Sequence, residues 1–181
     1  MNTYHPVVEI LVKSFGTSPE SLEPLHEQML AYSENTEGLK ETLLKHKVTS
    51  EAAFQQALAS YYELDYRENF DDIAVVREFT EFIPIRYAKK NVFFPLKKDR
   101  NNLEVAITNP ELSHPLDDLA RHFKCHIEPV ISHKQAVLDL INRAYDESSA
   151  STEEAVDKLD SEETFENILA VEEPEDLLDA T

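Results

Sequence analysis

Hydrophobic residues recur at helical spacing through the first sixty positions, and the pattern repeats with an offset of 32 residues. Residues of the same kind meet when position i is set against position i+32, including Glu9 with Glu41, Leu11 with Leu43, Thr17 with Thr49 and Ser18 with Ser50. A fixed offset that carries both apolar and capping positions is typical of a duplicated helix-turn-helix unit. We therefore predict tandem helical hairpins over residues 1–62.

The second helix of each copy follows a serine, Ser18 or Ser50. Serine is a favoured N-cap because its hydroxyl accepts a hydrogen bond from a backbone N–H of the first turn. Pro24 falls inside the second helix of the first copy, where proline removes a backbone hydrogen bond. We expect that helix to be kinked or shortened, so the first copy is the more degraded of the two.

From residue 63 the chain alternates between short strands and short helices. Helices are predicted over residues 71–82, 84–91, 116–123 and 132–145, and strands over residues 92–96, 103–107 and 125–131. Pro95 places the first strand at a sheet edge or at a bulge, since proline cannot donate to the strand ladder. Ser132 and Gln135 predict a capping box for the last helix. The fold class is α+β: tandem helical hairpins followed by a small α/β module over residues 63–145, with helices packed on a short three-stranded sheet.

An acidic tail over residues 146–181 follows the module. It holds 14 acidic residues and one basic residue, Lys158, in a 181-residue chain whose formal net charge is -19. Its small polar opening cannot bury enough apolar surface to offset chain entropy, which favours a largely disordered linker. The apolar residues within it are Phe165, Ile168, Leu169, Val171, Leu177 and Leu178. A competing interpretation is a docking segment for a basic groove on a partner or on a following domain.

Composition excludes several classes of function. The two glycines, Gly16 and Gly38, are too few for a loop whose backbone N–H groups cradle a phosphate. The negative net charge argues against nucleic-acid binding, and a single cysteine excludes an intramolecular disulfide. The N-terminus lacks a signal-peptide pattern, and the apolar runs are far shorter than the ~20 residues that cross a bilayer. We expect a cytoplasmic chain that inserts into no membrane.

Histidines surround the single cysteine in the run that contains His122, Cys125 and His126, with His114 and His133 nearby in sequence. Zinc takes four nitrogen or sulfur ligands, or three with a water. Cys125 and His126 are neighbours on a predicted strand and point to opposite faces, which separates them as ligands. No motif supports Cys125 as a nucleophile with His122 or His126 as its base. We expect Cys125 to be buried by packing and the chain to hold no metal or cofactor.

Paired carboxylates have a structural explanation in this sequence. Asp71 and Asp72 fall in the first turn of one predicted helix, and Asp117 and Asp118 fall in the first turn of another. Negative charge there complements the helix dipole, so neither pair requires a catalytic role.

Basic and aromatic residues are interleaved between positions 87 and 100. They are Tyr87, Lys89, Lys90, Phe93, Phe94, Lys97, Lys98 and Arg100. Such a run can bind single-stranded nucleic acid, but in an acidic protein it favours a solvated strand edge or a site for an acidic partner. A second aromatic group is predicted to form the junction between the helical repeat and the α/β module: Phe54, Tyr61, Tyr62 and Tyr66.

Several motifs occur in a distinctive order. Residues 43–58 read LLKHKVTSEAAFQQAL, a leucine-rich helix that leads to a serine-capped one, and further along lie residues 106–110, AITNP, and residues 128–130, EPV. In this order they resemble the MshEN-like N-terminal region of the type II secretion and type IV pilus assembly ATPases, over residues 7–145. The resemblance implies a non-enzymatic docking module that binds the cytoplasmic domain of an inner-membrane platform protein. It also implies that the ATPase core, whose Walker motifs this chain lacks, follows downstream in the parent protein.

Some members of that family bind cyclic di-GMP through helical units whose motif begins Arg-Leu-Gly and ends with Gln. The matching positions are Pro6, Val7, Val8 and Met29 in the first copy and Gly38, Leu39, Lys40 and Tyr61 in the second. Both arginines and both glutamines are missing, which removes the bidentate contact to phosphate or guanine. A cyclic di-GMP receptor with a degenerate site is therefore the alternative function, and an enzyme centred on Cys125 is the third hypothesis.

Overall fold

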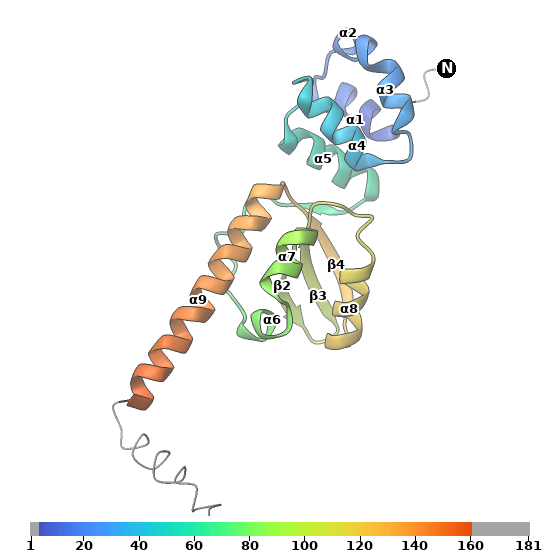
Figure 1. Ribbon diagram of the computed structural model, residues 1–181. Coiled ribbons are helices and arrows are strands. Elements are labelled where there is room, and N and C mark those ends of the chain that lie inside the picture. Colours follow the sequence, from blue (N-terminus) through green and yellow to red (C-terminus); the bar gives the residue numbers. More distant parts are fainter. Residues whose placement is uncertain (1–3, 161–181) are drawn as a thin grey trace, which may run out of the picture.

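The computed structural model describes residues 4–160, which form two lobes stacked end to end (Figure 1). We call the first the helical lobe, residues 6–62, and the second the α/β lobe, residues 65–160. The long helix α9, Lys134–Asp160, begins beside the helical lobe, runs along the α/β lobe and projects beyond it.

The helical lobe spans the residues of the two predicted copies. Its elements are α1 (Pro6–Phe15), α2 (Pro19–Leu22), the 3-10 helix η1 (Glu23–Leu25), α3 (His26–Ala31), α4 (Thr36–Lys45) and α5 (Glu51–Tyr62). α1 and α4 are each ten residues long, and α1 packs along α5. The second helix of the first copy is broken into α2, η1 and α3 at Pro24, as predicted.

The two capping serines behave differently. The Ser50 Oγ accepts a hydrogen bond from the Ala53 N–H at 3.1 Å and caps α5. Ser18 precedes α2 but makes no side-chain capping bond. The second copy is therefore the better formed of the two.

The α/β lobe is built on a sheet of strands β1 (Asp65–Tyr66), β2 (Phe93–Asp99), β3 (Asn102–Ile107) and β4 (His126–Ile131), in the order β1-β4-β3-β2. β2 pairs antiparallel with β3, whereas β4 runs parallel to β3 and to β1. The three predicted strands are confirmed, and β1 adds a fourth that is too short to show a pattern. Pro95 lies on the edge strand β2, beside a register shift, so both parts of its prediction hold.

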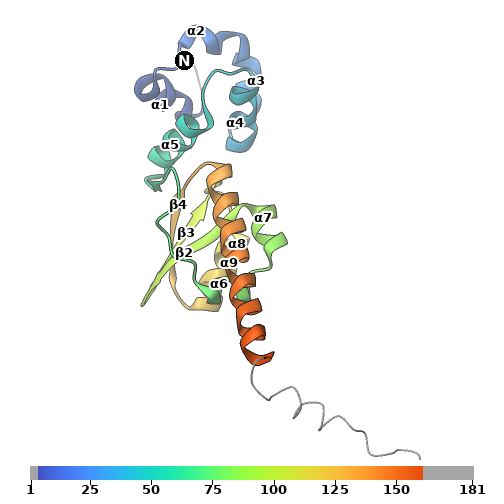
Figure 2. The same ribbon diagram turned by 90° about the vertical axis from the view of Figure 1, so that its left-hand side faces the viewer.

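The other helices of this lobe are α6 (Arg77–Phe82), α7 (Ile85–Asn91) and α8 (His114–Phe123). Figure 2 shows α7 and α9 on the same side of the sheet. Beneath the helices the core contains Phe79, Phe93, Phe94 and Phe123, together with the fully buried Leu103, Val105 and Ile107 of β3.

The predicted helix over residues 71–82 is wrong in its first half, because α6 begins only at Arg77. The Arg143 guanidinium on α9 donates hydrogen bonds to the carbonyl oxygens of Phe70, Asp71 and Ile73, which holds this stretch in a non-helical loop. Asp71 and Asp72 therefore do not face a helix dipole. Instead, both carboxylate oxygens of Asp72 accept from Arg67 Nη2 at 2.7 Å.

The predicted end of the last helix at Tyr145 is also wrong. α9 continues to Asp160, into the segment expected to be linker, where neither glycine nor proline interrupts the helix. The Ala136 N–H donates to His133 Nδ1 at 3.3 Å, so His133 caps the helix in place of Ser132. Residues 161–181, with their predicted disorder and apolar residues, lie outside the described residues.

Candidate functional site

The positions matched to the cyclic di-GMP motif lie mostly inside the helical lobe. Val7, Val8, Met29 and Leu39 are at most 1 % exposed and belong to the hydrophobic core. Lys40 is also buried, and its Nζ pairs with Glu37 Oε1 at 3.0 Å. The four apolar side chains therefore belong to the packing of the lobe, and the Lys40 ammonium group is already paired with Glu37.

The remaining motif positions are nearer the surface. Pro6 is exposed at the start of α1, and Tyr61 is exposed at the end of α5, with its ring edge-on to His5 at 5.1 Å. Gly38 packs under the ring of Tyr32, where an added Cβ would lie 2.4 Å from Cδ1. The absence of a side chain at Gly38 therefore makes room for Tyr32.

The histidines near Cys125 do not converge. The His122 ring stacks on Phe82 with 3.5 Å between centroids, and His126 is exposed on β4. Cys125 is buried, and its thiol donates to the Phe123 carbonyl oxygen at 3.2 Å. Within the described part of the chain, no three His, Cys, Asp or Glu residues are grouped so that they could hold a metal ion.

A buried glutamine joins the two lobes. Gln55 on α5 is fully buried, and its Nε2 donates to the carbonyl oxygens of Thr108, after β3, and Ser132, after β4, at 2.9 and 2.7 Å. Sequence reasoning misses this residue because a glutamine beside an apolar stripe resembles any exposed helical position. Its only local signal is its place between Phe54 and the buried Ala57 and Leu58.

The aromatic group predicted at the lobe junction divides in two. Tyr62 reaches the α/β lobe and donates to Glu111 Oε1 at 3.4 Å; burial, and then Glu111, raise the pKa of its hydroxyl. Tyr66 lies on β1, and burial raises its pKa as well. Phe54 is buried in the core, whereas Tyr61 contacts His5 within the helical lobe. Tyr62 thus contributes a side-chain hydrogen bond across the junction.

An open groove lies between the α6–α7 turn and α8. It encloses about 330 Å³ and is lined by Phe82, Ile83, Pro84, Tyr87, Phe93, Pro115, Asp118, Leu119, Arg121 and His122. Its walls are largely apolar, and Phe82 remains 37 % exposed at its edge. The Tyr87 hydroxyl on α7 donates to Asp118 Oδ2 on α8 at 3.4 Å.

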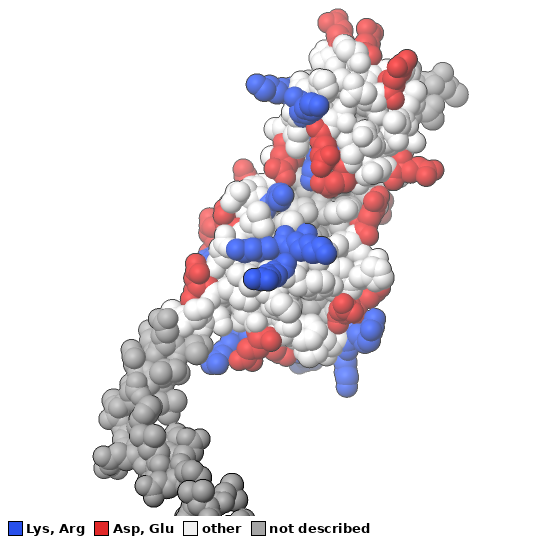
Figure 3. Space-filling view, viewed as in Figure 1, with Lys and Arg blue, Asp and Glu red and all other residues white. Residues whose placement is uncertain are grey.

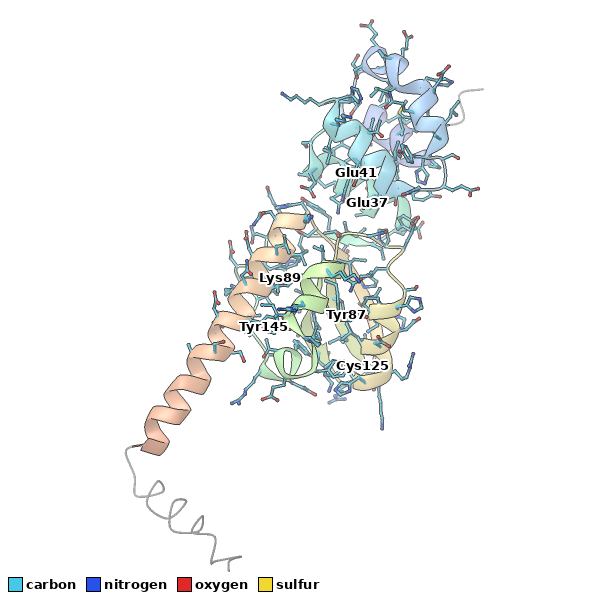
Figure 4. All side chains as sticks on the ribbon, in the orientation of Figure 1. Glu37, Glu41, Tyr87, Lys89, Cys125 and Tyr145 are labelled. Atoms are coloured by element: carbon cyan, nitrogen blue, oxygen red, sulfur yellow. The ribbon has the colours of Figure 1, made fainter. Side chains whose placement is uncertain are left out.

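The predicted basic concentration separates into two parts. Lys89 and Lys90 lie in the last turn of α7, the helix that also supplies Tyr87 to the groove (Figure 4). Figure 3 shows a cluster of basic side chains on the face of the molecule where α7 lies. Lys98, on β2, instead approaches Glu78 at 3.8 Å and lies over the Phe123 ring. Lys98 therefore belongs to the strand edge, and α7 carries an independent basic surface.

Among the described helices, none is both long and apolar enough to span a bilayer. Asp117 lies in the first turn of α8, as predicted, where it complements the helix dipole.

One protein family and several solved structures are similar to this chain. The MshEN domain family matches residues 62–151. Among solved structures, MshE with cdg is similar with a TM-score of 0.59 and 19 % identity, over 77 % of this chain and 98 % of that chain. The N-terminal domain of XpsE is similar with a TM-score of 0.56 and 18 % identity, over 76 % and 92 % of the two chains. No curated protein sequence matches.

At these identities the solved structures show a shared fold, and the similarity extends beyond residues 62–151. The resemblance predicted from the sequence is therefore confirmed. The MshEN family matches residues 62–151, and the fold of the chain is similar to those of MshE and of the N-terminal domain of XpsE.

Proposed function

With residues 62–151 forming an MshEN domain, we propose that this chain is a non-enzymatic docking module of a secretion or pilus ATPase. It binds the cytoplasmic part of an inner-membrane platform protein and connects that protein to the motor core. The observation that carries the proposal is the MshEN match, together with a fold similar to the N-terminal domain of XpsE. The scarcity of glycine supports a non-catalytic role, because a phosphate-binding loop requires several glycines.

The helical lobe provides a surface suited to this docking. Leu30, on α3, is 41 % exposed, and Tyr32, directly after α3, is 36 % exposed. Exposed apolar and aromatic side chains are typical anchors of protein interfaces, since burying them on a partner is favourable. We assign the contact with the platform protein to this end of the helical lobe.

A binding experiment tests the assignment. The cytoplasmic domain of the platform protein from the same genome is titrated against the chain and against the variant Leu30→Asp. We expect micromolar affinity for the chain and a loss of at least tenfold for the variant, about 1.4 kcal/mol.

The matched control is Val76→Asp, which places the same charge on a 36 % exposed apolar residue of the other lobe. Val76 is the N-cap of α6, where aspartate is well tolerated, so this variant remains folded. The absence of any complex at micromolar concentrations overturns the docking function. An equal loss of affinity in both variants overturns the assigned surface.

Binding of cyclic di-GMP is the second candidate function, and it is favoured by the similarity to MshE, whose solved structure is with cdg. Against it stand the burial of Val7, Val8 and Leu39 and the loss of both motif arginines. Calorimetry with the dinucleotide decides between the two. No heat of binding at ~100 µM, a regime of about −5 to −6 kcal/mol, removes this function.

A further inference from the structure

A strained residue joins helix α7 to strand β2. Val92 is the single residue between the end of α7 at Asn91 and the start of β2 at Phe93, and its backbone is left-handed, with φ 50° and ψ 63°. A branched side chain is crowded in this conformation, which glycine and asparagine adopt far more readily. The other described non-glycine residues with positive φ are Lys47, Glu63 and Lys124. None of these three is β-branched, so Val92 carries the largest backbone strain of the four.

The structure around Val92 holds it in this conformation. The Val92 N–H donates to the Ala88 carbonyl oxygen and closes the last turn of α7. Phe93, the next residue, is buried and paired with Ile107 in the sheet. Because helix and strand are both fixed, Val92 alone makes the turn between them. Such a conformation persists only where the surrounding contacts outweigh its cost, so strain is stored at this position.

Helix α7 is weakly attached to the rest of the α/β lobe. Ala88 is the one fully buried residue among its seven, and it contributes a single methyl group. No side chain caps the start of the helix at Pro84, and its first turn contains no acidic residue. The Tyr87 hydroxyl reaches Asp118 Oδ2 on α8 only at 3.4 Å, at an exposed position. Elements with few buried contacts open at a lower free energy than the core does.

The two ends of α7 differ in what holds them. Just before the helix, the Ile83 N–H donates to the Phe79 carbonyl oxygen at 3.0 Å, and the Ile83 carbonyl oxygen accepts from the Tyr145 hydroxyl on α9. These bonds fix the N-terminal end of α7 to the core, whereas its C-terminal end holds the strain of Val92. We propose that α7 is a lid that detaches from the α/β lobe by unwinding at Val92, with Ile83 as its fixed end.

Opening of this lid changes the groove between the α6–α7 turn and α8. Tyr87 and Phe93 both line the groove, and their rings lie edge-on with 5.6 Å between centroids. Phe93 is buried, so movement of α7 and Tyr87 uncovers an apolar wall that the closed form hides. The closed form gains the contacts of Ala88 and Tyr87, and the open form is relieved of the strain at Val92. A ligand that binds the uncovered Phe93 selects the open form.

Hydrogen exchange on the full chain tests the source of the opening. The variants Val92→Gly and Val92→Ala both remove the branched side chain, but only glycine also removes the Cβ that crowds a left-handed backbone. We expect amides of α7 to exchange about fivefold more slowly in the glycine variant than in the alanine variant. Exchange in α8 should be the same in both variants.

The matched control is the pair Lys124→Gly and Lys124→Ala, which makes the same two changes at the left-handed residue after α8. This pair should leave the exchange of α7 unchanged. Equal exchange of α7 in the two Val92 variants overturns the proposal. Slower exchange of α7 in Lys124→Gly than in Lys124→Ala identifies a change in the stability of the whole lobe and also overturns it.

Thiol labelling tests whether the helix detaches. Cys125 is the one cysteine of the chain, so in a Cys125→Ser background the variant Ala88→Cys carries a single thiol. Its matched control is Ala106→Cys, at an equally buried position on the central strand β3. We expect the thiol at position 88 to react with Ellman's reagent at least about tenfold faster than the thiol at position 106. Equal rates mean that α7 opens only when the whole lobe unfolds, which overturns the lid. Neither test contains a platform protein, so both succeed or fail independently of the proposed docking function.

Discussion

The buried core of the helical lobe consists mainly of aliphatic side chains, whereas the core of the α/β lobe combines aliphatic side chains with five phenylalanines. In the helical lobe Phe54 is the one buried phenylalanine among the described residues, beside Val7, Leu11, Leu39 and Leu43. In the α/β lobe the buried phenylalanines are Phe70, Phe79, Phe93, Phe94 and Phe123. Each of these rings buries more area than an aliphatic side chain, and four of them lie edge-on to a neighbouring ring: Phe79, Phe93, Phe94 and Phe123. We therefore expect single large side chains to contribute more to stability in the α/β lobe than in the helical lobe.

The comparison predicts its largest effect at Phe79. This side chain is fully buried and lies edge-on to Phe94 and Phe123, with centroid distances of 6.4 and 5.6 Å. We expect Phe79→Ala to lower the free energy of unfolding by about 3–5 kcal/mol, because it leaves a cavity that the rigid sheet cannot close. Urea denaturation followed by circular dichroism measures the change.

Phe82→Ala is the control for this prediction, because Phe82 lies on the same helix but is 37 % exposed. Its cost should remain below about 1 kcal/mol. Similar losses in the two variants would contradict this expectation for the α/β lobe.

The next effect tests how the lobes are joined. Gln55→Leu removes the donor of two hydrogen bonds and leaves the buried carbonyl oxygens of Thr108 and Ser132 without it. We expect a loss of about 2 kcal/mol, because an unsatisfied buried acceptor costs about 1–3 kcal/mol. The same substitution at the exposed Gln28 of the helical lobe should be nearly neutral. An equally small effect at Gln55 would show that the two lobes associate without this link.

The sequence predicts those parts of the fold and of the candidate site that depend on interactions between residues close together in the chain. Three predictions rest on local properties and are confirmed: the capping by Ser50, the break at Pro24 and the edge position of Pro95. The duplication of the helical unit stays a prediction. The family resemblance is predicted over residues 7–145, whereas the MshEN family matches residues 62–151. The non-helical loop before α6 does not follow from local properties, because it depends on Arg143, which is 70 or more positions away.

The contact of Gln55 at the lobe junction could not be predicted from the sequence for the same reason. Gln55 acquires its role only when Thr108 and Ser132 reach α5, 53 and 77 positions later. The cyclic di-GMP positions are an intermediate case. The missing arginines are visible in the sequence, but the burial of Val7, Val8 and Leu39 is visible only in the fold.

Removing the Tyr145 hydroxyl from the α/β lobe should have a smaller effect on the free energy of unfolding, and this effect should depend on pH. The Tyr145 hydroxyl on α9 donates to the Ile83 carbonyl oxygen, and burial raises the pKa of Tyr145 to about 12. We expect Tyr145→Phe to cost about 1.5 kcal/mol at neutral pH, because the buried Ile83 carbonyl loses its donor.

The sign of the pH effect follows from the raised pKa. Between pH 10 and 12 the tyrosine of the unfolded chain loses its proton, while the folded chain keeps it. The unfolded state then binds fewer protons, so stability falls as pH rises. The difference between the chain and the Phe variant should therefore shrink over this range in denaturation experiments. A constant difference would contradict the assigned pKa.

The smallest effect returns to the two copies of the helical repeat. Ser50→Ala removes the hydrogen bond to the Ala53 N–H and should cost about 1 kcal/mol, the usual value for an N-cap. Ser18 occupies the equivalent position but makes no capping bond, so Ser18→Ala should change the free energy of unfolding by less than about 0.5 kcal/mol. The two variants have the same chemistry and equivalent places in sequence, so their difference in urea denaturation measures how far the first copy has degraded. Equal losses would mean that both copies retain their caps and that Pro24 breaks the helix without altering its start.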